Sequence, residues 1–579
     1  MKNIKRGRFS QATNKPWLLA ALIALAVIAC VVPFYRAGAA APSSGTINPV
    51  VDTQVTWTGT ATGGTAIEAE ASCDEGVNCD TYTLNVSGVP ADWTGKSIRV
   101  RINWISPSND YDMYVHKDSN TGPVIDDSAD GPTNVEEVVL NPAQTGTGVY
   151  TVHVVYFAVP IAAVDQYQGS ARVFVPPPTV TPAPAPQASG LAPRYVAHVP
   201  QKSITDTGKG LDSSEPTLGN NWNTGRTMYQ SLLTTFRVTF DDACPSSPTS
   251  FWEDKSPVTS ANSLDPLLWT DSGNGGIGGP GRTIVSQLSG TTSLSSYTDN
   301  DGDTWIPNEG GSGTSGVDHQ GIGGGPFHAP FPGGVTYQHG VWYCSQNIAD
   351  ATCSLSLDGG TTYGPAVPIY TINQCGGLHA HPKVAPDGTV YVANSKCESD
   401  GILSYTKQGV VVSEDNGITW AVRTIPGSIA GDSDPSVEIG KNGRVYIGMA
   451  NGNSKPVVAV SDDQGRNWTN LFDVGTAFYI NAVAFPAVIA GDNDRAAFAF
   501  FGSTAPGNGD DLQSYFGVWH LYVATTYDGG ATWHTVNATP NDPIQRGAIW
   551  LGGGSPPHRN LLDFFDATVD KQGRVLVGY

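Results

Sequence analysis

Four octapeptides of one design recur in the second half of this 579-residue chain, and they constrain its fold more than any other feature. They are SLDGGTTY from Ser356, SEDNGITW from Ser413, SDDQGRNW from Ser461 and TYDGGATW from Thr526. The shared Asp carboxylate can accept hydrogen bonds from the amides of a tight turn, and the shared Gly can adopt the positive φ that such a turn requires. The pattern predicts a structural hairpin turn, defined in the four copies by Asp358 and Gly360; Asp415, Gly417 and Trp420; Asp463, Gly465 and Trp468; and Asp528, Gly530 and Trp533.

The spacing of these turns predicts the architecture. A fifth copy begins at Thr298 with Asn300 in place of Asp, and a stretched sixth copy lies near Thr239. The five clear copies start 58, 57, 48 and 65 residues apart. Such intervals fit one four-stranded antiparallel blade per repeat. The sequence therefore predicts an all-β propeller of six or seven four-stranded blades.

The octapeptides resemble the Asp boxes of the sialidase-like, or BNR-repeat, β-propellers, and this resemblance covers residues 195–579. Propellers with these boxes include sialidases, other glycan-processing enzymes and non-catalytic binding proteins, so the resemblance implies a fold more strongly than an activity. For an exo-sialidase-type glycoside hydrolase it implies an arginine triad, an Asp acid/base and a Tyr nucleophile activated by Glu. Glu438, on an expected inner strand, is the candidate partner for such a Tyr.

The family's early Arg-Ile-Pro motif is missing from this chain. The nearest string is Arg423-Thr-Ile-Pro, which follows the box at Ser413 and is interpreted as the end of an outer strand. The catalytic set cannot be transferred residue by residue. Two interpretations therefore stay open: a protein that acts on or binds extracellular glycans, and a non-catalytic binding or structural propeller of the cell envelope.

Residues 1–41 have the pattern of a bacterial-type export signal, with basic residues, an apolar run from Trp17 to Val32 and then small residues. The tetrapeptide that ends at Cys30 resembles a lipobox, so a lipid anchor is an alternative to release. No later segment has the roughly 20 apolar residues that a spanning helix needs. We therefore expect a secreted or envelope protein, attached to a membrane only through this signal or a lipid.

Charge and cysteine content agree with export. The formal net charge is -21, and it becomes -27 without residues 1–41, which carry six basic and no acidic residues. Phosphate backbones would be repelled, so nucleic acid is excluded as a partner. An oxidising compartment favours disulfides, and close spacing predicts three pairs, Cys73 with Cys79, Cys344 with Cys353 and Cys375 with Cys397, which leaves Cys244 over.

The chain divides into a predicted β-sandwich at 48–175, a Pro/Ala-rich linker at 176–193 and the propeller at 195–579. The GVYTVHV segment and the Asp110-Tyr-Asp112 strand start resemble the prepeptidase C-terminal type of jelly-roll domain. Asp110 and Asp112 are candidate calcium ligands, with a solvated acidic loop as the alternative. The propeller pattern stops inside an apolar strand at Tyr579, which indicates a truncated propeller or a last blade completed by strands near Tyr195.

A second repeat, out of phase with the boxes, predicts the candidate site. Acidic residues or His precede five expected innermost strands, at Glu215, Asp265, His381, Asp434 and Asp566. We expect these side chains to converge at one end of the propeller channel, near further candidates Asp318, His319, His379, Asp563 and Arg559. Polar caps on the strands are the alternative. An acidic ring would favour a divalent metal such as calcium, or a neutral glycan or glycoprotein, over free sialic acid.

Overall fold

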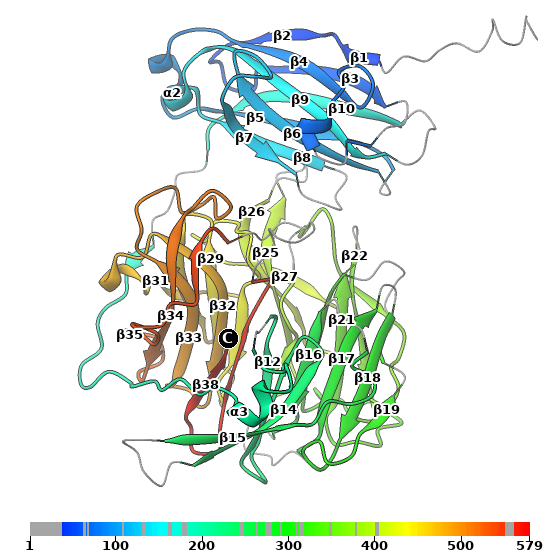
Figure 1. The fold of residues 1–579 in the computed structure, drawn as a ribbon, viewed down its shortest axis with the longest axis vertical. Coiled ribbons are helices and arrows are strands. Elements are labelled where there is room, and N and C mark those ends of the chain that lie inside the picture. Colours follow the sequence, from blue (N-terminus) through cyan, green and yellow to red (C-terminus); the bar gives the residue numbers. More distant parts are fainter. Residues whose placement is uncertain are drawn as a thin grey trace, which may run out of the picture. The chain divides into compact units, whose positions relative to one another are not determined.

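The structure is a computed structural model that describes residues 38–579 except 62–64, 67–68, 107–108, 130–134, 160–164, 177–181, 212–213, 242–247, 262–264, 273–280, 290–291, 309, 312–317, 347–349, 377–378, 400–404 and 550–560. The chain forms two compact units, Met1–Pro177 and Pro178–Tyr579. Both are built almost entirely from β-strands, as expected from the sequence (Figure 1).

The first unit is a β-sandwich. One sheet has the order β1 (Gly38–Ala41), β3 (Gln54–Ala61), β10 (Asp165–Phe174), β5 (Ser97–Asn103) and β8 (Val135–Leu140). The other has the order β2 (Ser44–Ile47), β4 (Cys79–Val86), β9 (Gly148–Ala158), β6 (Asp110–Lys117) and β7 (Val124–Ser128). Short turns of 3-10 or α-helix lie at η1 (Ala69–Ser72), η2 (Pro90–Trp93) and α2 (Pro142–Thr145).

Alternating apolar residues form the sandwich core. Ile98, Val100 and Ile102 on β5 are fully buried, as the period of two residues predicts for one face of a strand. Trp57 on β3 stacks on Tyr82 on β4 with 3.9 Å between ring centroids, and this contact joins the two sheets. Strands β1 and β2 extend the sandwich upstream of residue 48.

Among the described residues, the second unit contains six sheets that each have four consecutive antiparallel strands. They are β12 (Thr217–Asn221), β13 (Arg226–Ser231), β14 (Thr234–Asp241) and β15 (Thr249–Asp254); β16 (Pro266–Thr270), β17 (Thr283–Ser289), β18 (Thr292–Thr298) and β19 (Ile306–Asn308); β20 (Asp318–Gly325), β21 (Gly340–Gln346), β22 (Asp350–Ser356) and β23 (Val367–Thr371); β24 (Lys383–Val384), β25 (Val390–Ser399), β26 (Tyr405–Ser413) and β27 (Ala421–Thr424); β28 (Ser436–Ile439), β29 (Val445–Asn451), β30 (Lys455–Ser461) and β31 (Thr469–Asp473); and β32 (Ala482–Ala490), β33 (Ala496–Ser503), β34 (Gly517–Thr526) and β35 (His534–Asn537). Smaller elements are β11 (Ala183–Pro184), α3 (Lys202–Thr205), η3 (Thr476–Phe478) and β36 (Gln545–Gly547). Of these, β11 and β36 add a fifth strand to two of the six sheets.

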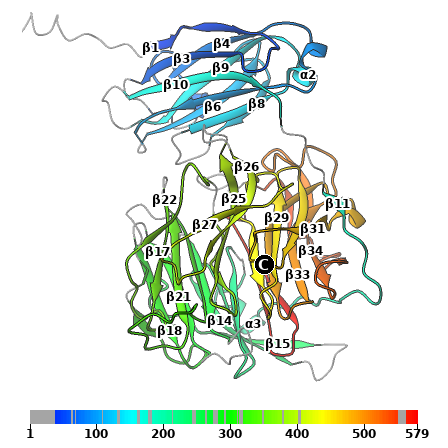
Figure 2. The same cartoon turned by 180° about the vertical axis from the view of Figure 1, so that it is seen from behind.

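A two-stranded sheet of β37 (Asp566–Val569) and β38 (Val575–Gly578) closes the ring of innermost strands. The first strand of each sheet contacts the first strand of the next, and β37 contacts both β32 and β12. Figure 2 shows the sheets of this unit from behind. The indole N–H of Trp222, just after β12, donates to the carbonyl of Val569 at 2.9 Å. The unit is therefore a propeller of seven sheets, consistent with a sialidase-like propeller, and its last described sheet has two strands.

Two segments near the linker differ from the sequence interpretation. Around Tyr195 the described chain forms no strand, and Tyr195 instead contacts Thr525 through their hydroxyl groups at 3.3 Å. Within the predicted linker, β11 pairs in parallel with β31, and the amide of Trp533 donates to the carbonyl of Pro186 at 2.9 Å. Part of the Pro/Ala-rich linker thus adds a short strand to the outer edge of one sheet. The linker also accepts a backbone hydrogen bond from Trp533, beside the outer strand of another sheet.

The box turns have the geometry that the octapeptides predict. At Ser413 the hydroxyl donates to Asp415 Oδ1 at 3.0 Å, the amide of Gly417 donates to the Ser413 hydroxyl at 2.8 Å, and the amide of Thr419 donates to Asp415 Oδ1 at 2.9 Å. The same bonds recur in the boxes at Ser356, Ser461 and Thr526. Each box joins the third strand of a sheet to the fourth, so its role is structural.

We expect Gly417→Ala to destabilise the protein more than Gly443→Ala. Both glycines have positive φ, 79° and 92°, which costs a non-Gly residue about 1 kcal/mol. A Cβ at Gly417 would also lie 2.3 Å from Trp342 Cζ3, whereas a Cβ at Gly443 would meet nothing within 4 Å. The expected losses in the free energy of unfolding are about 2–4 and about 1 kcal/mol, measured by urea denaturation. Equal losses would show that backbone conformation alone sets the cost.

The three predicted disulfides are formed: Cys73–Cys79, Cys344–Cys353 and Cys375–Cys397. Cys344 and Cys353 lie directly opposite each other on β21 and β22, and Cys397 holds the segment after β23 to the next sheet. Cys244 lies outside the described residues. Disulfides are typical of proteins outside the cytoplasm. In the described parts of the chain, we find no helix with the length and apolar character needed to cross a membrane.

Candidate functional site

Carboxylates from three sheets meet where the innermost strands begin. Glu215 precedes β12, Asp265 precedes β16 and Asp563 precedes β37, and one carboxylate oxygen from each lies within 4.8 Å of the other two. Glu215 is fully buried and Asp265 nearly so. The group thus joins two positions of the second repeat, Glu215 and Asp265, with Asp563, which lies three residues before the repeat position Asp566.

His319 is the cation of this cluster. Its Nδ1 lies 3.2 Å from Asp434 Oδ2, and its Nε2 lies 3.8 Å from Asp563 Oδ2. Burial by itself would lower the pKa of His319, but the charges of Asp434, Asp563 and Asp265 outweigh it and hold that pKa well above its ordinary value. His319 has a left-handed backbone with φ of 47° at a bulge in the β20–β21 pairing. We call Glu215, Asp265, His319, Asp434 and Asp563 the acidic cluster.

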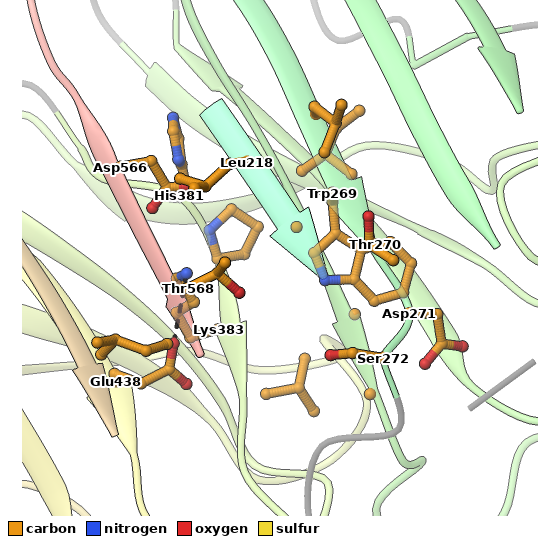
Figure 3. Close-up of a pocket in the computed structure, with 18 of the residues that line it drawn as sticks. Leu218, Trp269, Thr270, Asp271, Ser272, His381, Lys383, Glu438, Asp566 and Thr568 are labelled. Atoms are coloured by element: carbon orange, nitrogen blue, oxygen red, sulfur yellow. Dashed lines mark ion pairs between the residues drawn. The ribbon is translucent and has the colours of Figure 1, made fainter. Parts of the chain in front are cut away.

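A small cavity of about 70 Å³ lies along the same ring of strands. Its lining includes His381, Lys383, Glu438, Asp566, Trp222 and Trp269, and several of these are drawn in Figure 3. Lys383 Nζ lies 3.4 Å from Glu438 Oε2. Burial would lower the pKa of Lys383, but the carboxylates of Glu438 and Asp566 raise it, so Lys383 is charged. The cavity therefore combines an ion pair, hydrogen-bonding groups and indole rings.

Two neutral imidazoles complete the surroundings. Burial, and then the positive charge of Lys383, lower the pKa of His381, whose ring meets Phe564 edge-on at 4.9 Å between centroids. Burial, and then the charge of His319, lower the pKa of His379 to about 4, and its Nδ1 lies 3.1 Å from the carbonyl oxygen of Ala380. At neutral pH both rings are uncharged, unlike His319.

The structure brings most predicted residues together. Glu215, Asp265, His319 and Asp434 share the acidic cluster, and His381 and Asp566 line the neighbouring cavity. The side chain of Asp318 and all of Arg559 lie outside the described residues. Lys383 was missed by sequence reasoning, although its place two residues after His381 on an innermost strand could have indicated it.

Arginine residues of the propeller serve other contacts. Eight of those at described positions form ion pairs, namely Arg226 with Asp301, Arg237 with Glu253 and Asp303, Arg282 with Asp299, Arg423 and Arg466 with Glu414, Arg444 with Asp462, Arg495 with Asp492, and Arg574 with Asp570. Arg546 lies on β36. Arg423 lies on β27, the fourth strand of its sheet, as its interpretation as an outer strand requires. In the described part of the lining, the cavity has no arginine. Glu438 pairs with Lys383, which corrects its expected pairing with a Tyr.

The calcium candidates in the sandwich gain no support. Asp110 and Asp112 lie on β6, where Asp112 is buried and the hydroxyl of Tyr114 lies 3.4 Å from its Oδ2. Asp126 and Asp127, acidic residues further along the chain, belong to strand β7. Among the described residues, neither Asp110 nor Asp112 belongs to a group of three close ligand atoms.

Comparison with known proteins gives similarity in fold only. No family model matches the chain, and no curated protein matches it. Among solved structures, Hadza microbial sialidase Hz136 is 12% identical over 82% of this chain and 89% of that chain, with a TM-score of 0.35. A mutant of the Aleuria aurantia lectin, in complex with Fucα1-6GlcNAc, is 12% identical over 56% and 94%, with a TM-score of 0.33. The pre-peptidase C-terminal domain of collagenase from Bacillus anthracis is 17% identical over 23% and 94%, with a TM-score of 0.14. This chain is thus distantly similar in fold to sialidase and lectin propellers and, in part, to a pre-peptidase C-terminal domain.

Proposed function

We propose that this protein is an extracytoplasmic propeller that binds uncharged glycans at the acidic end of its channel. The observation that carries the proposal is the acidic cluster, in which Asp434 and Asp563 lie against His319 while Glu215 and Asp265 lie beside Asp563. The remaining negative charge repels the carboxylate of an anionic sugar. Sugar hydroxyl groups, in contrast, can donate hydrogen bonds to these oxygens.

The neighbouring cavity supports the same ligand class. Sugar rings bind where an aromatic surface lies beside a few fixed polar groups, and Trp222 and Trp269 lie beside Lys383 and Asp566. The volume of about 70 Å³ has space for several water molecules, so it can receive the edge of one sugar ring. The three disulfides and the predicted export signal support a ligand outside the cytoplasm.

Release of sialic acid is the second candidate function. It would need cations at the substrate carboxylate, and described arginines are engaged in ion pairs away from the cavity. Arg559 is the arginine nearest in sequence to Asp563. A fluorogenic sialoside assay on the wild type and on Arg559→Ala tests this candidate directly. Turnover that Arg559→Ala abolishes would favour the sialidase interpretation over the proposed one.

A glycan array that compares neutral, sialylated and uronic-acid-containing oligosaccharides tests the proposed binding. We expect retention of neutral glycans only, because the acidic cluster repels the other two classes. Asp434→Asn and His381→Ala should weaken the binding of a retained glycan by about 10- to 100-fold in calorimetry, since each removes a polar contact. Asp462→Asn, at an exposed ion pair with Arg444, is the matched control and should bind normally.

Two results would contradict the proposal. Preferential retention of sialylated glycans would show that positive charge dominates the channel. Normal glycan binding by Asp434→Asn and His381→Ala, together with a lower unfolding temperature, would show that these residues only cap strands, as the alternative interpretation of the repeat holds.

A further inference from the structure

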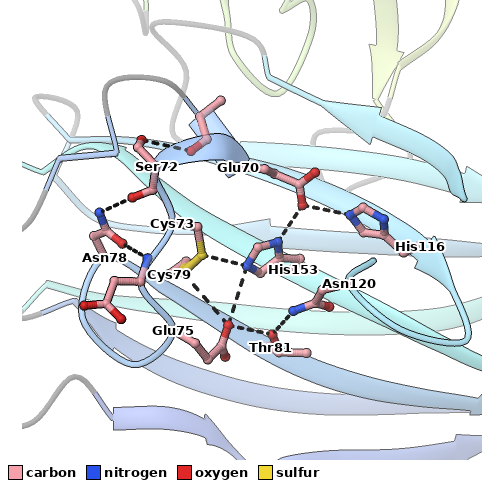
Figure 4. The surroundings of a disulfide bond; sticks show 12 residues. Glu70, Ser72, Cys73, Glu75, Asn78, Cys79, Thr81, His116, Asn120 and His153 are labelled. Carbon is pink, nitrogen blue, oxygen red and sulfur yellow. Dashed lines mark hydrogen bonds and ion pairs between the residues drawn. A yellow bond between two sulfur atoms is a disulfide. The ribbon is translucent and has the colours of Figure 1, made fainter. Parts of the chain in front are cut away.

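The β-sandwich contains two buried histidines that face one carboxylate. His116 on β6 and His153 on β9 are 3% and 4% exposed, and Glu70 lies on the short turn η1 (Figure 4). Glu70 Oε1 lies 2.8 Å from His116 Nε2 and 2.5 Å from His153 Nδ1. These three ligand atoms come from three separate elements and lie within 4.8 Å of one another.

The outer nitrogens of both rings also face acceptors. His116 Nδ1 lies 3.0 Å from the carbonyl oxygen of Gly122, and His153 Nε2 lies 3.6 Å from Glu75 Oε2. A neutral imidazole carries one N–H and one lone pair, so it can donate to only one of two acceptors. The four ring nitrogens face three acceptor oxygens, because both inner nitrogens face Glu70 Oε1. Donation from all four nitrogens would require two imidazolium ions, or a cation in place of the two inner protons.

A divalent ion meets this requirement without a change in charge. Each imidazole keeps its outer proton for Gly122 or Glu75, and each gives up its inner proton, so one doubly charged ion replaces two protons. An outer hydrogen bond to a carbonyl or carboxylate is what orients metal-binding histidines in proteins.

We propose that Glu70, His116 and His153 form a binding site for a divalent transition-metal ion of the zinc class. Two imidazole nitrogens and one carboxylate oxygen suit such an ion better than calcium or magnesium, which prefer oxygen ligands alone. Metal–ligand bonds of about 2 Å require the ligand atoms to separate slightly. Glu70 can retreat because its side chain is 25% exposed and lies on a turn, which also gives the ion a route from solvent.

The site would fasten turn η1 to the second sheet. The Cys73–Cys79 disulfide holds the segment that follows this turn. Cys73 Sγ lies 3.0 Å from His153 Nε2, so the disulfide also contacts the site. Thr81 donates to Glu75 Oε2 at 3.0 Å, and Asn120 donates to Thr81, so the outer partner of His153 is itself held in place (Figure 4). This arrangement places the ion at the junction of β4, β6 and β9.

The test uses the full chain. A chelator first removes metal, and reductant is left out so that Cys73–Cys79 stays intact. The protein is then titrated with zinc against a chromophoric chelator at pH 7. We expect a site for about one ion that Glu70→Gln and His116→Gln each weaken by about 100-fold or more. His520→Gln is the matched control, because His520 lies on β34 with its Nδ1 against the carbonyl oxygen of Thr539.

A pair of salt bridges without a metal predicts different results. Zinc binding that is unchanged in both Glu70→Gln and His116→Gln would place the ion elsewhere and overturn the proposal. A wild-type protein that binds no zinc would overturn it as well. If His116→Gln does not fold, Glu70→Gln still tests the site, because it changes a partly exposed side chain on a turn.

Discussion

Replacing His319 with Ala is expected to lower the free energy of unfolding by about 3–5 kcal/mol at pH 7. The imidazolium lies against Asp434 and Asp563, and its removal leaves the carboxylates of the acidic cluster without their buried counter-ion. Urea denaturation measures the loss. His534→Ala, at a partly exposed ring on β35, is the control and should cost less than about 1 kcal/mol.

The pH dependence of this loss follows from the direction of the pKa shift. The folded pKa of His319 lies well above the unfolded value of about 6.5. Its contribution to stability is therefore fully present below about pH 6.5 and is lost as pH rises through the folded pKa. The deficit of His319→Ala should therefore be largest below about pH 6.5 and shrink as pH rises through the folded pKa. A deficit that stays constant from pH 5 to 9 would show that packing, not charge, is lost.

Replacing Lys383 with Met is expected to cost about 3–5 kcal/mol, because it leaves Glu438 as a buried carboxylate without its cation. The side chain of Glu438 is 5% exposed, and Lys383 lies 3.4 Å from it. The double variant Lys383→Met/Glu438→Gln should regain part of the loss, while Asp566 still lacks its positive neighbour. A double-mutant cycle from urea denaturation gives the coupling energy.

An exposed ion pair provides the control for this prediction. Lys396 pairs with Asp432 at 3.1 Å, but the two side chains are 35% and 65% exposed. Lys396→Met should therefore cost less than about 1 kcal/mol. Equal losses for Lys383→Met and Lys396→Met would contradict the view that the channel pair is shielded from water.

The box turns were predictable because their interactions are local. All the bonds that fix Asp415 and Gly417 lie within one octapeptide, so the residue types and their spacing contain the needed information. The acidic cluster was predictable in outline for a related reason, because the repeat assigns Glu215, Asp265 and Asp434 the same phase on successive strands. The direction of a repeat places equivalent residues at the same end of a channel.

Other features depend on partners that no local pattern connects. Glu70 and His153 are 83 residues apart in the chain, and they meet only because a short turn lies over β9. Lys383 acquires its role from Glu438 on the next sheet. The docking of Pro186 against Trp533 spans two sheets and an irregular segment. Each case requires the packed structure, because the sequence specifies the residue types but not which of many acceptors they reach.

The closure of the ring by β37 has a consequence for how the propeller folds during synthesis. Trp222 and the carbonyl of Val569, whose hydrogen bond joins the two ends of the ring, are 347 residues apart. Six sheets emerge before the sheet that unites β32 with β12, and until then two apolar sheet faces lack neighbours. Contacts of such separation form slowly and leave apolar surface open to aggregation. The closing sheet is therefore the step at which the nascent propeller depends most on chaperones, and hydrogen exchange in the mature protein should be fastest, among the innermost strands, at β37.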